Sequence, residues 1–284
     1  MRMFTNYVKN KKTIKDIINV NKAEMYENLF KDDNSKTNFL RKKVLPYGWH
    51  WLYFSENYSI NQIGADGHPK RGIFFPKLQG CKRMFAGSKI EFIKDIKFND
   101  KVTKVSKIKK IENKGKENTT IYLLHINHLY KVKNQVVLEE NQNLVFINQN
   151  YKTKRKVLYK KEKEYSFLYK KKISFSNVLL FRYSSITYNS HRIHYDVEYT
   201  RREEGYKDLL VHGPLLATVA LDEFRKNINY KLTDFEFRMF KPVLVNEEIH
   251  LKIFKNIQNK KEFKIIFICL KKKEVKFIAF CKRK

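Results

Sequence analysis

The sequence predicts an α+β fold made of two similar units, each with a helix packed against a curled antiparallel sheet. The composition indicates long strands, because the 284-residue chain has nine glycines, five prolines and many Ile, Val, Phe and Tyr residues. Strand-like segments also fall into two sets of four, one in each half of the chain. Each set follows a helical pattern. The same order of elements therefore occurs twice, which favours a duplicated unit.

The first unit is expected to span residues 21–150. Asn21 is placed to cap a short amphipathic helix over residues 22–30. Residues 44–82 are aromatic but interrupted by Gly and Pro, so this stretch either caps a core or lines a pocket. Strand-like segments with polar breaks between them then follow at residues 84–96, 101–111, 119–133 and 135–148.

A charged tract at residues 151–173 is predicted to link the two units, and the second unit then covers residues 174–284. This unit opens with a strand-like run at residues 179–188 and a polar loop. An apolar helix follows from Gly213, with its leucines buried and with Asp222, Glu223 and Arg225 expected to face outward. Four more strand-like segments complete the unit at residues 232–241, 248–257, 262–270 and 275–281.

The formal net charge of +31 favours partners that carry negative charge. The lysines are spread along the whole chain, and no zinc-finger, basic-zipper or RNP-type motif accompanies them, which argues against a nucleic-acid-binding protein. The charge suits a phosphorylated substrate handle or an acidic carrier protein instead.

Three cysteines, Cys81, Cys269 and Cys281, are an odd number without C-x-x-C spacing. They predict neither a disulfide framework nor a thiolate metal site, and they suggest a reducing compartment. We interpret Cys269 as a small buried hydrophobe. Two further histidines, His125 and His128, lie at odd and even positions of one expected strand, so they should face opposite sides rather than share a metal.

The chain has no apolar run of the roughly 20 residues that a membrane helix needs, so a soluble or peripheral protein is expected. Its first fifteen residues contain five basic residues and no acid. Residues 1–20 are therefore a candidate targeting segment, and an ordinary basic N-terminus is the alternative.

The stretch from Tyr183 to Phe224 carries the candidate chemistry. His191 and His194 lie three residues apart in a polar loop, and a Gly-Pro pair soon afterwards opens the apolar helix. The N-terminus of a helix presents unpaired N–H groups, which can stabilise an oxygen that becomes negative while a nearby imidazole moves a proton. This pairing predicts an active site.

Six residues of this stretch fall at the spacings of a known signature: Tyr183, Ile186, Thr187, Asn189, Ile193 and His194. The signature is that of the MaoC-like (R)-specific enoyl-CoA hydratases, which have the hot-dog fold. The blocks NSHRIHYD, LPYGWHWLYF, DGHPKRG and KRMFAGS resemble most closely the branch of fungal mitochondrial 3-hydroxyacyl-thioester dehydratases type 2 and mesaconyl-C4-CoA hydratases. The resemblance runs from about residue 44 to residue 240.

The resemblance implies a double hot-dog enzyme that interconverts (3R)-3-hydroxyacyl and trans-2-enoyl thioesters without a metal or redox cofactor. The acyl group would be carried on the phosphopantetheine of CoA or of an acidic acyl carrier protein, in type II fatty acid synthesis in the mitochondrial matrix. The second unit would be catalytic, the first would shape the acyl pocket, and a homodimer is an expected assembly. His194 would be the base, Asn189 would hold the hydroxyl, and the N–H of Gly213 would stabilise the thioester oxygen, with Pro214 in the first helical turn.

One position departs from the family signature, because Asn189 stands where the hydratases have aspartate. An amide cannot exchange a proton near pH 7. The second proton-transfer group would be His191 or Asp196, or His194 would shuttle the proton alone.

Other residues are candidates for substrate contact, and a structural role stays open for several of them. His212 either contacts substrate or has a structural role, in which it caps the helix or orients the loop. Arg192 binds an anionic group or pairs with Asp196. Trp49 and Trp51 line an acyl tunnel or pack in the core. The whole group of predicted substrate-binding residues is Tyr183, Arg192, His212, Pro214 and Trp49.

A second class of function remains open from the sequence. The missing aspartate favours a hot-dog scaffold that has lost its chemistry and uses its basic surface to bind nucleic acid or an acidic partner. The presence of His194 and of the Gly-Pro helix start favours the enzyme.

Overall fold

A computed structural model describes residues 4, 6–31, 43–78, 80–115, 119–148, 157–160, 163–228 and 230–284. Within these residues, ten strands form one antiparallel sheet in the order β1-β3-β4-β5-β2-β7-β10-β9-β8-β6. The strands are β1 (Lys11–Ile17), β2 (Cys81–Phe92), β3 (Lys101–Asn113), β4 (Ile121–Val132), β5 (Gln135–Asn148), β6 (Tyr165–Ile173), β7 (Leu232–Met239), β8 (Ile249–Asn256), β9 (Glu262–Cys269) and β10 (Glu274–Arg283).

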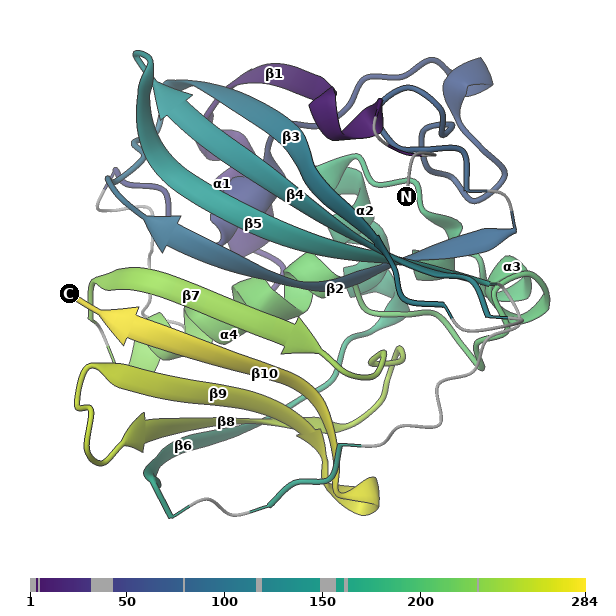
Figure 1. Ribbon diagram of the computed structural model, residues 1–284. Helices are drawn as coiled ribbons and strands as arrows, with labels where there is room; N and C mark the ends of the chain where they lie inside the picture. Colours follow the sequence, from purple (N-terminus) through teal and green to yellow (C-terminus); the bar gives the residue numbers. More distant parts are fainter. Residues whose placement is uncertain are drawn as a thin grey trace.

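The strand order has an internal two-fold pattern centred on the pair β2 and β7. These strands run antiparallel, with Ser88 opposite Phe237, and Figure 1 shows them side by side at the middle of the sheet. Outward from this pair come β5, β4, β3 and β1 on one side and β10, β9, β8 and β6 on the other. The predicted duplicated α+β architecture is confirmed.

Four α-helices accompany the sheet in the described part of the chain: α1 (Val20–Glu27), α2 (Asn177–Thr187), α3 (Val197–Arg202) and α4 (Gly213–Ile228). In Figure 1, α1, α2 and α4 lie on the same side of the curled sheet. Helix α4 is the longest and forms the centre of the core, with Leu215 and Ala220 fully buried. Burial of its apolar stripe against the sheet explains why this helix is stable.

The prediction that Asp222 and Glu223 face outward is wrong, because both carboxylates are buried on α4. Asp222 accepts hydrogen bonds from the Tyr26 hydroxyl at 3.0 Å and from the Trp49 indole N–H at 2.9 Å. Glu223 accepts one from the Tyr169 hydroxyl of β6 at 2.9 Å. Buried carboxylates need such partners, and these bonds fasten α4 to its neighbours.

Two elements differ from the sequence prediction in type. The strand-like run at residues 179–188 belongs to helix α2, whose buried Leu180 and Tyr183 are three residues apart and whose first turn is capped by Ser176. The second part of the predicted linker forms β6, which pairs with β8. Most β6 side chains are exposed, because an edge strand buries little, so the segment reads as charged and irregular. Residues 149–156 of the linker region lie outside the described residues.

The N-terminal region also differs from expectation. Residues 11–17 of the candidate targeting segment form β1, which pairs with β3 along its whole length. Helix α1 begins two residues earlier than predicted, because Asn19 rather than Asn21 is the cap and accepts a hydrogen bond from the backbone N–H of Lys22. No helix in the described part of the chain is long and apolar enough to cross a membrane.

The first-half helix α1 has 8 residues, whereas α4 has 16. Residues 43–78 form loops with short 3₁₀ turns at Trp49–Leu52 and Ile60–Gln62. The inner faces of β3, β4 and β5 are therefore left partly uncovered. The three cysteines are all buried and free, which confirms Cys269 as a core residue.

Candidate active site

A cavity of about 1370 Å³ lies between the two halves of the molecule. Its walls are the loop that carries His191 and His194, the start of α4, and the uncovered inner face of the first-half sheet. A cavity of this size at the junction of two units is typical of a small-molecule site. Nearly all sequence-predicted site residues line it, and they are Tyr183, Asn189, His191, Arg192, His194, His212, Gly213 and Pro214.

His194 is fixed in one tautomer by the backbone. It ends a short 3₁₀ turn, and its Nδ1 lies 2.8 Å from the carbonyl oxygen of Leu210. A carbonyl only accepts, so Nδ1 carries the proton and Nε2 keeps its lone pair. Burial lowers the pKa of His194 to about 4, so the ring is neutral at pH 7. The structure thus presents a neutral base in the cavity wall.

His212 holds the ring of His194 from one side. The two imidazoles are stacked, with centroids 3.6 Å apart and an angle of 21° between their planes. A hydrogen bond of 2.8 Å joins Nε2 of His212 to the hydroxyl of Ser184 in α2. His212 is fully buried, and burial moves its pKa well below the usual value. Of the two roles left open by the sequence, the geometry supports orientation of the loop and of His194.

Gly213 begins α4 at the point where the two halves of the sheet meet. A Cβ atom at this position would lie 2.9 Å from Cε of Met239 and 3.3 Å from Cβ of Phe85. A larger residue would therefore displace the end of the Met239 side chain and tighten the contact with Phe85. The first N–H groups of α4 have no partner within the helix, so they are available to an oxygen atom in the cavity.

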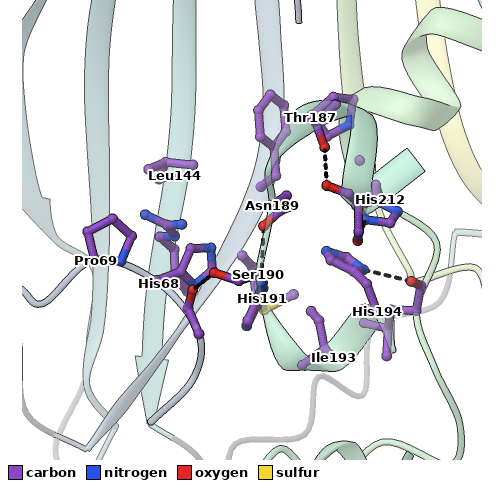
Figure 2. A pocket seen from close by; sticks show the side chains of 18 of the residues that line it. His68, Pro69, Leu144, Thr187, Asn189, Ser190, His191, Ile193, His194 and His212 are labelled. Carbon is purple, nitrogen blue, oxygen red and sulfur yellow. Dashed lines mark hydrogen bonds between the residues drawn. The ribbon is translucent and has the colours of Figure 1, made fainter. Parts of the chain in front are cut away.

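Asn189 and His191 form the turn that precedes His194. The side-chain oxygen of Asn189 accepts a hydrogen bond of 3.1 Å from the backbone N–H of His191, which leaves the amide NH₂ group as the part free to meet a ligand. The rings of His191 and His194 are 5.4 Å apart and almost perpendicular. Burial lowers the pKa of His191 well below its usual value. Figure 2 shows Asn189, His191, His194 and His212 around the same space.

A loop of the first half also reaches the site, and sequence reasoning missed its role. His68, from the DGHPKRG block, packs against His191 with ring centroids 3.9 Å apart. Figure 2 shows the two rings beside each other. Only the resemblance of the DGHPKRG block to the hydratases and dehydratases pointed to this segment. Nothing in its local sequence pattern predicts contact with residues about 120 positions later in the chain.

Three predicted residues have structural partners instead of a clear path to substrate. Arg192 is bound to Asp196 at 2.7 Å and to the carbonyl oxygen of Ala65 at 3.1 Å. Asp196 also caps α3 by accepting a hydrogen bond from the backbone N–H of Tyr199, and it is not among the residues that line the cavity. Trp49 is fully buried against α4 and is not among the residues that line the cavity, which supports the alternative of core packing.

The far end of the cavity is polar as well as aromatic. Trp51 lines it and donates to the buried carboxylate of Glu140 at 3.1 Å. Lys104 lies above the ring of Tyr130, with Nζ 5.3 Å from its centroid. His128 faces the cavity, whereas His125 lies outside the cavity lining and pairs with Glu112, as the odd spacing of the two histidines predicted. In the described residues, no three His, Cys, Asp or Glu side chains are arranged to hold a metal ion.

Comparison with known proteins places this site in a family. The model of the hydroxyacyl-thioester dehydratase type 2 family matches residues 48–245, which contain every residue of the site described above. The chain belongs to this family. It is 30% identical over 199 residues to mesaconyl-C(4)-CoA hydratase of Chloroflexus aurantiacus, covering 70% of this chain and 71% of that one. It is 35% identical over 79 residues to the mitochondrial hydroxyacyl-thioester dehydratase type 2 of Schizosaccharomyces pombe, covering 27% and 26% of the two chains.

Solved structures share the fold. A MaoC-like dehydratase from Phytophthora capsici superposes with a TM-score of 0.73 at 13% identity, covering 98% of this chain and 97% of that one. A Mycobacterium tuberculosis protein described as having a double hotdog fold gives a TM-score of 0.61 at 10% identity, covering 98% and 97%. The predicted double hot-dog is therefore confirmed, and the family name confirms a hydro-lyase of the hydratase and dehydratase class.

Proposed function

We propose that this chain removes water from (3R)-3-hydroxyacyl thioesters, or adds it to trans-2-enoyl thioesters, with His194 as the base at C2. The supporting observation is the tautomer of His194, whose Nδ1–H is bound to the carbonyl oxygen of Leu210 so that the Nε2 lone pair is free beside the start of α4. A proton next to a thioester is weakly acidic, so its removal needs a neutral base and a stabilised enolate oxygen together.

In the dehydration direction, Nε2 of His194 takes the C2 proton while the thioester oxygen gains negative charge. The N–H of Gly213 donates to that oxygen, and the positive end of the α4 dipole adds to the stabilisation. The C2=C3 double bond forms as the C3–O bond breaks, and the hydroxyl leaves as water once it gains a proton. The Asn189 amide can hold this hydroxyl but cannot supply the proton, so a second group at the cavity has to supply it.

The carrier of the acyl group is proposed to be the phosphopantetheine of CoA or of an acidic acyl carrier protein. The net charge of +31 favours an acidic carrier, because opposite charge accelerates encounter. A role in mitochondrial type II fatty acid synthesis is proposed from the resemblance to the Schizosaccharomyces pombe enzyme, whose name places it in mitochondria. The homodimer expected from the sequence stays a prediction.

The test is turnover by the purified chain of one trans-2-enoyl group presented on CoA and on acyl carrier protein. Hydration removes the conjugated thioester absorbance, and we expect activity with at least one carrier and a higher kcat/KM at low salt with the acidic protein. Asn189 in place of aspartate is the observation that favours the non-catalytic alternative. No turnover with either carrier, together with salt-dependent binding of an acidic partner, would establish that alternative instead.

A further inference from the structure

The loop of residues 64–72 in the first half is locked to the histidine loop of the second half. Gly67 has a φ of +83°, and a Cβ atom on it would lie 1.7 Å from the backbone oxygen of Ser190. The Ser190 hydroxyl donates to the carbonyl oxygen of Gly67 at 2.5 Å, and the backbone N–H of Arg192 donates to the carbonyl oxygen of Asp66 at 3.0 Å. The two loops therefore keep a fixed relative position on either side of the cavity.

This contact presents His68 to the cavity with a carboxylate behind it. Asp66 accepts a hydrogen bond of 2.9 Å from the backbone N–H of His68 through Oδ1, and its Oδ2 lies 3.5 Å from Nδ1 of the His68 ring. Nδ1 is buried and makes no hydrogen bond at this distance. Because Nδ1 faces Asp66, the opposite edge of the ring, with Nε2, is the part that lines the cavity.

We propose that Asp66 and His68 form a carboxylate–imidazole pair that exchanges the proton of the substrate hydroxyl, in place of the family aspartate that is absent at Asn189. This inference rests on the proposed dehydration at the same cavity. Dehydration starts from the pair with one added proton, in which His68 is an imidazolium. Its Nε2–H protonates the oxygen as the C3–O bond breaks, the electron pair of that bond leaves with water, and a neutral ring remains. In hydration, Nε2 takes a proton from water as its oxygen attacks C3.

The surroundings of His68 favour the neutral ring, which is the form with which hydration begins. Burial, with Arg83 and Arg71 nearby, moves the pKa of His68 well below its usual value, so the ring is neutral in the free protein and able to accept a proton from water. The imidazolium that then forms faces the carboxylate of Asp66, whose Oδ2 lies 3.5 Å from Nδ1 and 3.7 Å from Arg71, and this negative charge stabilises the positive ring. His191 packs on the other face and sets the angle of the ring.

Within one turnover, one proton is taken from C2 and one proton is given to the hydroxyl. His194 gains a proton as His68 loses one, and proton exchange with solvent after product release returns both rings to their starting forms. No oxidant, metal ion or further reactant is needed.

A change of leaving group tests the role of His68. Chloride leaves without a proton, so a 3-chlorobutyryl thioester needs the base but not the acid. We expect His68→Gln to lower kcat/KM for dehydration of (3R)-3-hydroxybutyryl-CoA by about 100-fold or more, the size of a general acid contribution. Elimination of chloride from the matched 3-chlorobutyryl-CoA, corrected for the spontaneous reaction, should fall by less than about 5-fold. Asp66→Asn should give the same pattern with a smaller loss.

One control variant and one wild-type measurement distinguish failure of this inference from a folding defect and from failure of the proposed function. His125→Gln replaces a histidine that pairs with Glu112 outside the cavity lining, and it should change neither rate. If His68→Gln lowered kcat/KM equally for the hydroxyl and the chloride substrate, the residue would have a structural role and the proposal would be overturned. Unchanged kcat/KM for dehydration in this variant would overturn it too. Failure of the proposed function looks different, since the wild-type chain would then eliminate neither water nor chloride.

Discussion

Replacement of Gly67 by alanine tests how the two halves share the active site. A Cβ atom there would lie 1.7 Å from the backbone oxygen of Ser190, so the two loops would have to separate by more than about 1 Å. A shift of this size at catalytic groups costs about 100-fold in rate, or about 2.7 kcal/mol of transition-state stabilisation. The positive φ adds about 1 kcal/mol of backbone strain.

Gly80 offers a matched control, because it also has a positive φ of +64° but has nothing within 4 Å of an added Cβ. Gly80→Ala should therefore show the backbone cost alone and keep the wild-type rate. The assay is kcat/KM for hydration of a trans-2-enoyl-CoA, with thermal unfolding measured on both variants. If Gly67→Ala were as active as Gly80→Ala, the claim that the first-half loop positions the catalytic histidines would be refuted.

Three further predictions concern acid stability, the acyl end of the cavity and the surface ion pair. Burial lowers the pKa of His194 to about 4 and that of His128 to about 3, so the unfolded chain binds more protons than the folded one below about pH 6.5. The free energy of unfolding should therefore fall by about 3 kcal/mol per group as the pH drops from about 6.5 to about 4. Urea denaturation at a series of pH values measures this, and a free energy of unfolding that does not change with pH would contradict it. Lys104→Met should raise the ratio of kcat/KM for thioesters with long alkyl chains to kcat/KM for four-carbon ones by about 5-fold, because an alkyl chain in the cavity would no longer cover a charge. An unchanged ratio would indicate that the acyl chain does not bind beside Lys104. Arg192→Gln should lower the free energy of unfolding by about 1 kcal/mol or less and change KM by less than about 2-fold, because this arginine pairs with Asp196 at the surface. A large rise in KM would instead support its predicted role in binding substrate.

The sequence predicted the parts of the fold that have a clear local period. The alternating segments of β3, β4 and β5 and the apolar stripe of α4 were identified, because each of these elements buries one face. The sequence predicts a strand where helix α2 lies, since a short aromatic run does not distinguish the two periods. It predicts a linker where β6 lies, because the exposed lysines of this strand hide its pairing with β8.

The residues of the candidate site also fall into a group that the sequence predicts and a group that it does not. His194, Asn189 and Gly213 are close in sequence or carry a family signature, so their grouping could be predicted. The buried carboxylate of Asp222 and the contact of His68 with His191 depend on segments more than 100 residues apart, and only the packed structure brings them together. Family resemblance marked the DGHPKRG block but gave no role to its histidine.

The central claim is that the free Nε2 of His194 is the base at C2, and the His194→Gln variant tests it most directly. Glutamine has about the length of the histidine side chain, but its amide cannot accept a proton near pH 7. We expect kcat/KM for hydration of a trans-2-enoyl-CoA to fall by about 1,000-fold with the binding of the thioester retained. Activity of His194→Gln within about 3-fold of the wild-type rate would contradict the assignment.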